Sequence, residues 1–135
     1  MSDQAVHEFA LHPSPSAKTE AEEAFRRILT GDSAALLDRA MLLVSELLAN
    51  EEGAGGTARI ESLSVKVALS ARSVRVEIRD QGTGLVLGGL RKHSRPASRG
   101  WSPHLLSRIA DRWGLVSGVE GAWIWFELDL PPGGY

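Results

Sequence analysis

The chain has 135 residues, which predicts a single domain over residues 1–135 with a core large enough to need no disulfide or metal. It contains no cysteine, so disulfide bonds, thiolate catalysis and cysteine-ligated zinc are excluded. The formal net charge is −2, with 15 basic and 17 acidic residues interspersed, and this balance disfavours nucleic acid and a membrane surface as partners.

The first half of the chain predicts one strand and two helices. Residues 5–11, AVHEFAL, precede two prolines and predict a short edge strand. Residues 16–31, SAKTEAEEAFRRILTG, predict a helix with an acidic start and a basic end, closed by Gly31. Residues 34–50, AALLDRAMLLVSELLAN, carry apolar residues at helical spacing and predict a second helix.

The second half predicts a hairpin, a long loop, a helix and a last strand. Residues 59–70 and 73–80 alternate apolar and polar residues across a short turn, as antiparallel partners do. Residues 81–100 are rich in glycine, lysine and arginine and predict a loop, residues 102–113 a helix, and residues 121–130 a strand. The order predicts an α+β fold, a two-layer α/β sandwich with helices on one face of a mixed, mostly antiparallel sheet.

Two polar residues near the end of the second predicted helix are candidates for chemistry. Glu46 and Asn50 are four residues apart, so they share one face of a helix. Together they could orient a hydroxyl group and ligate Mg²⁺ through oxygen, the ligand atom that this ion prefers. Alone, the pair is more often a solvent-exposed glutamate and an asparagine near a helix C-terminus.

A second candidate follows the predicted strand 73–80. Asp80 could accept a hydrogen bond from an exocyclic amine such as that of adenine. Gly82 and Gly84 have no Cβ, so the backbone there could approach a flat ring. The alternative is a plain Asp-Gly turn at the end of a strand.

The segment GWSPHLL, residues 100–106, starts the predicted third helix and has two interpretations. It could hold phosphate on the free N–H groups of a helix N-terminus, those of His104 included. It could also be an ordinary helix start, because Ser102 is a favoured N-cap and Pro103 a favoured first residue. Pro103 has no N–H, so we expect this segment to bind phosphate more weakly than a segment with two glycines would. Basic residues 91, 92, 95 and 99 could neutralise a triphosphate or simply keep the loop solvated.

The ordered segments LLVSELLAN, VRVEIRDQGTGL, RGWSPHLLSRIADRWG and WIWFEL together resemble the histidine-kinase-like ATPases. The resemblance spans about Leu42 to Leu130 and is strongest to the anti-sigma-factor serine/threonine protein kinases. It implies the Bergerat ATP-binding fold, with ATP and Mg²⁺ as cofactors. Neither a Walker-type phosphate loop nor the G-x-S-x-G motif of serine hydrolases occurs in the sequence.

The resemblance also implies roles for particular residues. Glu46 matches the general base for transfer to a protein serine, and Asn50 matches the Mg²⁺ ligand. Asp80 matches the aspartate that recognises adenine by a hydrogen bond. The residues that would surround the nucleotide are Asn50, Asp80, Gly82, Gly84, Gly100, Ser102 and His104.

Three departures from the family pattern fall around this expected site. Glu51 and Glu52 follow Asn50 and would repel a triphosphate that they faced. Trp123 stands where the family usually has threonine, and is large enough to fill part of the pocket. Ser102 and Pro103 replace the second glycine of the phosphate segment and the residue after it.

The resemblance implies an ATP-binding anti-sigma-factor-type serine/threonine kinase that regulates transcription by partner switching. Its partners would be an anti-anti-sigma-type protein, a sigma factor or both, and a homodimer is one option for its assembly. The alternative is a degenerate, non-enzymatic module of the same fold that sequesters one of these partners without ATP. Because the sequence contains no export signal and no apolar segment of ~20 residues, we expect a cytoplasmic protein.

Overall fold

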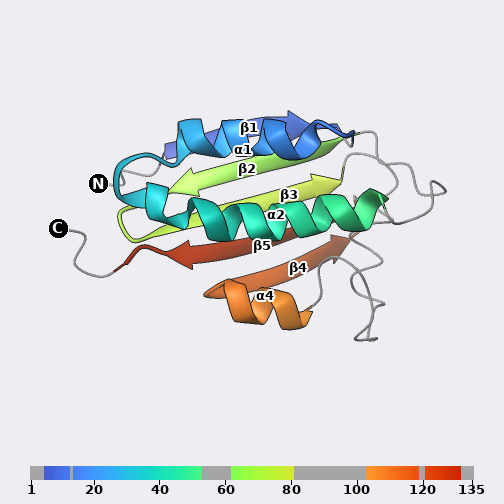
Figure 1. The fold of residues 1–135 in the computed structure, drawn as a ribbon. Helices are drawn as coiled ribbons and strands as arrows, with labels where there is room; N and C mark the ends of the chain where they lie inside the picture. The colour runs from blue at the N-terminus through green and yellow to red at the C-terminus, as the bar shows by residue number, and fades with distance from the viewer. Residues whose placement is uncertain (1–4, 13, 53–61, 81–102, 119–120, 132–135) are drawn as a thin grey trace.

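Figure 1 presents the computed structural model, which describes residues 5–12, 14–52, 62–80, 103–118 and 121–131. In chain order the elements are β1 (Ala5–Leu11), α1 (Ala17–Ile28), the 3₁₀ helix η1 (Gly31–Leu36), α2 (Leu37–Glu52), β2 (Leu63–Leu69), β3 (Ser73–Asp80), α4 (Pro103–Ile109), β4 (Arg112–Gly118) and β5 (Gly121–Asp129). The strands form one sheet in the order β1-β2-β3-β5-β4. The three α-helices lie on one face of it, as predicted (Figure 1).

The sheet is antiparallel at every pairing of the described strands, so the prediction of a mixed sheet is wrong. The predicted hairpin is confirmed: β2 pairs with β3, with Leu69 opposite Val74 at the turn. β4 and β5 form a second hairpin, with Gly118 opposite Gly121. In the chain, β4 lies between α4 and β5 and reverses the direction of the chain. The last strand, β5, is therefore antiparallel to β3.

Alternating side chains divide the sheet into a helix-covered face and an opposite face, here called the open face, which no described helix covers. On the helix-covered face the central strands contribute the fully buried residues Val65, Val67, Val76, Ile78, Ile124 and Phe126. They pack with Phe25 of α1 and with Ala40, Leu43 and Val44 of α2. Apolar and polar residues alternate along these strands in the sequence, and this alternation decides which side of each strand faces the core.

The first helix agrees with its prediction in position and charge. It has Glu20 in its first turn and Arg26 and Arg27 in its last, which suits the helix dipole. The α-helix ends at Ile28, and Gly31 follows with a φ of +60°, in the left-handed region that glycine adopts without strain. There the chain enters η1, so the predicted helix 34–50 has a 3₁₀ start and its α-helical part spans Leu37–Glu52.

The prediction of one helix over residues 102–113 is wrong in its second half. The helix α4 ends at Ile109, and a strand that was not predicted, β4, begins at Arg112. The chain leaves the helix where the N–H of Asp111 donates to the carbonyl of Glu127 at 2.9 Å. Trp113 then packs against the core from a strand, in register with Phe126.

The open face carries a network of charged and aromatic side chains over β3, β5 and β4. The guanidinium of Arg75 lies 4.2 Å from the ring centroid of Trp125. The indole lies so close to Gly114 that a Cβ there would be 2.6 Å from its Nε1. Arg75 donates to Glu77 and Glu127 at 3.0 and 3.2 Å. Within this network Trp125 is half-buried.

Glu127 is expected to make the stability of the fold depend on pH. Arg112 Nε donates to its Oε1 at 2.6 Å, and this bond, with that from Arg75, holds the pKa of Glu127 below its usual value of 4.5. A depressed pKa means that the ionised carboxylate stabilises the fold above pH 4.5, and that this contribution is lost as the pH falls through the folded-state pKa. Glu127→Gln should therefore lower the free energy of unfolding by about 1 kcal/mol at pH 7.

Denaturant unfolding of wild type and Glu127→Gln at a series of pH values tests this prediction. The difference between the two proteins should shrink as the pH falls below 4.5. Glu22→Gln is the matched control, since Glu22 pairs with Arg26 in an exposed i,i+4 contact of 2.6 Å. A Glu127→Gln difference that is constant across the acid range would show that the charge of Glu127 contributes nothing.

Candidate functional site

Three elements that carry predicted site residues each have one terminus at the same end of the sandwich. Figure 1 shows the C-terminal end of α2, the C-terminal end of β3 and the N-terminal end of α4 together on its right-hand side. Asn50 lies in the last turns of α2, Asp80 is the last residue of β3, and Pro103 is the first residue of α4. These three ends, far apart in the sequence, therefore face the same end of the fold.

The helix α2 positions the first pair of candidate residues. It runs unbroken from Leu37 to Glu52, so Glu46 and Asn50 are one helical turn apart, as predicted. Glu46 follows the buried residues Leu43 and Val44, which fix this part of the helix on the sheet. The Glu46 side chain is half-buried, and no described residue forms an ion pair with it. The side chain of Asn50 lies outside the description.

The strand β3 positions Asp80. It lies in the middle of the sheet, between β2 and β5, and Asp80 is in register with Leu63. Ile78, two residues earlier, is fully buried against the helices. The backbone of Asp80 is thus held by the central strand, while its side chain lies outside the described part.

The helix α4 has seven residues and is anchored by the buried Leu106. His104 belongs to its first turn, with its side chain outside the description. Four predicted site residues, together with the basic loop 91–99, fall outside the described residues altogether: Gly82, Gly84, Gly100 and Ser102. Their roles stay predictions.

A residue that the sequence analysis missed, Arg39, connects α2 to the far end of α4. Its guanidinium donates to the carbonyl oxygens of Ile109 and Asp129 at 3.3 and 3.5 Å, and lies 3.7 Å from the carboxylate of Asp111. Asp111 in turn accepts from the N–H of Asp129 at 2.7 Å. A sequence signal existed, because Arg39 is four residues before the buried Leu43 and so interrupts the apolar face of the helix.

Trp123 does not lie where the sequence analysis expected. Its neighbour Ile124 is fully buried on the helix-covered face, so Trp123 lies on the open face of the sheet. There the guanidinium of Arg79 lies 4.2 Å from the centroid of the indole ring. This side chain therefore does not fill a space between the helices and the sheet.

Within the described ranges, no three histidine, aspartate or glutamate residues gather in a way that could hold a metal ion. Among the helices that the structure describes, none has the length and apolar character to cross a membrane.

Comparison with known proteins adds no family assignment, since the sequence matches no family model and no curated protein matches it significantly.

Proposed function

We propose that this chain has the Bergerat ATP-binding fold and acts as an ATP- and Mg²⁺-dependent serine/threonine protein kinase of the anti-sigma type. The observation that supports this most is that the C-terminal ends of α2 and β3 and the N-terminal end of α4 face the same end of the sandwich (Figure 1). Glu46, Asn50 and Asp80 come from elements that end there. A helical layer over an antiparallel sheet is compatible with the proposed fold.

Each of these residues has a role in the proposal. Asp80 accepts a hydrogen bond from the amine of adenine. Asn50 would coordinate Mg²⁺ through its amide oxygen, and the ion would neutralise charge on the phosphates. Glu46, half-buried and without a described ion-pair partner, takes the proton from the serine hydroxyl of the protein substrate.

The proposed substrate is a serine on an anti-anti-sigma-type protein, and the second partner is a sigma factor. Phosphorylation adds a charge of about −1.5 to −2 to the serine, which is sufficient to change which partner is bound. The chain would thus regulate transcription in the cytoplasm by exchanging partners.

A second candidate function has an observation of its own. The helix α4 begins at Pro103, which lacks the N–H that a phosphate would need at that position. In addition, α2 continues through Glu51 and Glu52, so two carboxylates directly follow Asn50 on the same helix. Both features weaken a nucleotide site, and they favour a non-enzymatic module that sequesters a protein partner without ATP.

Calorimetric titration of the full chain with Mg-ATP, and with ATP in EDTA, separates the two candidates. We expect wild type to bind Mg-ATP at least about tenfold more tightly than ATP alone, a difference of about 1.4 kcal/mol, because Mg²⁺ held by Asn50 would neutralise charge on the phosphates. Asn50→Ala should remove this magnesium dependence. Thr19→Ala, on the exposed side of α1, is a control that should bind as wild type does.

Two outcomes would contradict the kinase proposal. If neither form of ATP binds, the sequestering function is the better account. If ATP binds equally well with and without magnesium, the role given to Asn50 is wrong.

A further inference from the structure

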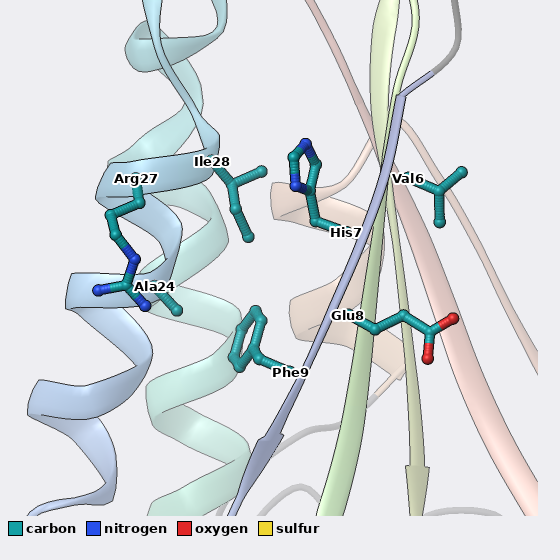
Figure 2. Close-up of a pocket in the computed structure, with 7 residues that line it drawn as sticks. All are labelled: Val6, His7, Glu8, Phe9, Ala24, Arg27 and Ile28. Carbon is teal, nitrogen blue, oxygen red and sulfur yellow. The ribbon is translucent and has the colours of Figure 1, made fainter.

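A groove of about 430 Å³ lies between the edge strand β1 and the helix α1 (Figure 2). It is distant in sequence from every residue of the proposed nucleotide site. Among the described residues, those that line it come from these two elements: Val6, His7, Glu8, Phe9, Ala24, Arg27 and Ile28.

The groove has an apolar part, formed by Phe9, Ala24 and Ile28, and a polar part, to which His7 and Arg27 contribute. Figure 2 shows His7 and Phe9 on the side of β1 that faces α1, and Val6 and Glu8 on the opposite side. Phe9 is fixed by an edge-to-face contact with Phe25, whose ring centroid is 5.6 Å away. Together with Ala24 and Ile28 of α1, Phe9 offers a surface that an apolar side chain could cover.

The strand β1 has a free edge along this groove. In the described sheet it pairs with β2 on one side only, so the N–H and C=O groups of alternate residues point outward. Four successive residues at its start, Ala5 to Glu8, are exposed, and Val6, an apolar residue, is 49% accessible. Such an edge can accept another strand.

The groove also has an unbalanced positive charge. Arg27 lines it, and no described carboxylate lies within ion-pair distance of its guanidinium. Its neighbour Arg26, in contrast, is paired with Glu22 at 2.6 Å. The one carboxylate in the lining, that of Glu8, points to the other face of the sheet. The complementary occupant is therefore anionic on the side that faces α1.

We propose that β1 binds an extended, acidic segment of a protein partner as an additional strand of the sheet. The backbone of the segment pairs with the free edge of β1. Residues two apart in a strand face the same side, so one apolar side chain can cover Phe9 while a carboxylate on the same side pairs with Arg27. This proposal does not rest on nucleotide binding.

Two peptides test the proposal on the full-length protein. In acetyl-TVTETVTE-amide the valines and glutamates share one face of a strand, and acetyl-TVTKTVTK-amide has the opposite charge on that face. Titration followed by amide resonances of the ¹⁵N-labelled protein should give saturable shifts in β1 and α1 with the first peptide and none with the second. Slower hydrogen exchange at alternate β1 amides should accompany binding, because these groups gain partners.

A matched pair of variants tests the role of charge. Arg27→Glu and Arg26→Glu change the net charge equally in the same turn of α1, but Arg27 alone lines the groove. We expect Arg27→Glu to weaken binding of the acidic peptide about tenfold or more, and Arg26→Glu less than about twofold.

Three results would overturn the proposal. One is the absence of saturable shifts in β1 with the acidic peptide. Another is an equal loss of affinity in the two variants. The third is protection of the β1 amides that grows with protein concentration in the absence of peptide, because the occupant of the edge would then be a second copy of this chain.

Discussion

Asp80→Asn is expected to weaken ATP binding about a hundredfold, since a charge-assisted hydrogen bond to a buried base contributes roughly 1.5 to 3 kcal/mol. The melting temperature should change little, because Asp80 is the last residue of β3 and the strand is anchored two residues earlier by Ile78. Isothermal titration with Mg-ATP and a thermal melt of the same sample measure both effects.

Two controls make the result specific to adenine. Asp32→Asn removes the same charge from η1, at the opposite end of the sandwich, and should leave ATP binding unchanged (Figure 1). GTP should bind wild type poorly, because guanine has a carbonyl oxygen where adenine has the amine that Asp80 would accept from. If Asp80→Asn keeps its affinity for ATP, the adenine role of Asp80 is wrong.

Glu46→Gln is expected to keep the affinity for ATP and to lower phosphoryl transfer by about 10²- to 10⁴-fold, the usual contribution of a general base. A glutamine at this position keeps the size of the side chain but cannot accept a proton. Glu46 is half-buried beside the buried Leu43 and Val44, so its position is fixed by the helix and the variant should fold normally.

Transfer of labelled phosphate from ATP to a serine of a protein partner is the measurement for Glu46. Glu23→Gln, on the exposed side of α1, is the matched control and should be fully active. A wild-type protein that binds ATP but labels no partner would favour the sequestering function. A Glu46→Gln variant with normal transfer would remove Glu46 from the reaction.

The elements that the sequence predicted best are those with a single, clear period. In residues 63–69 and 73–80, alternate residues such as Val65 and Val76 are buried, and the strands form as predicted. The same period could have placed Trp123 correctly, because Ile124 and Phe126 must face the core and Trp123 must then face away.

The strand β4 was missed for a physical reason. Leu105, Ile109 and Trp113 are spaced four residues apart, so their apolar pattern continues that of a helix. In the structure Trp113 also packs against the core, but from a strand, because hydrogen bonds with β5 replace those of the helix after Ile109. Local periodicity cannot distinguish these two ways of burying one side chain.

The contacts of Arg39 and the groove beside β1 depend on the assembled fold. Arg39 bonds with the carbonyl oxygens of Ile109 and Asp129, which are 70 and 90 residues away in the chain. The groove needs a free strand edge next to α1, and this follows from the order of the strands. Of the candidate site, the sequence could predict that Glu46 and Asn50 share a helix, but the common end of α2, β3 and α4 emerges only in three dimensions (Figure 1).

The most direct test of the proposed nucleotide site is a map of amide chemical-shift changes when the ¹⁵N-labelled protein is titrated with Mg-ATP. The account predicts saturable changes in the last turns of α2, at the end of β3 around Asp80 and at the start of α4, with β1 and α1 unaffected. Spectra that do not change with Mg-ATP, or changes confined to other elements, would contradict it.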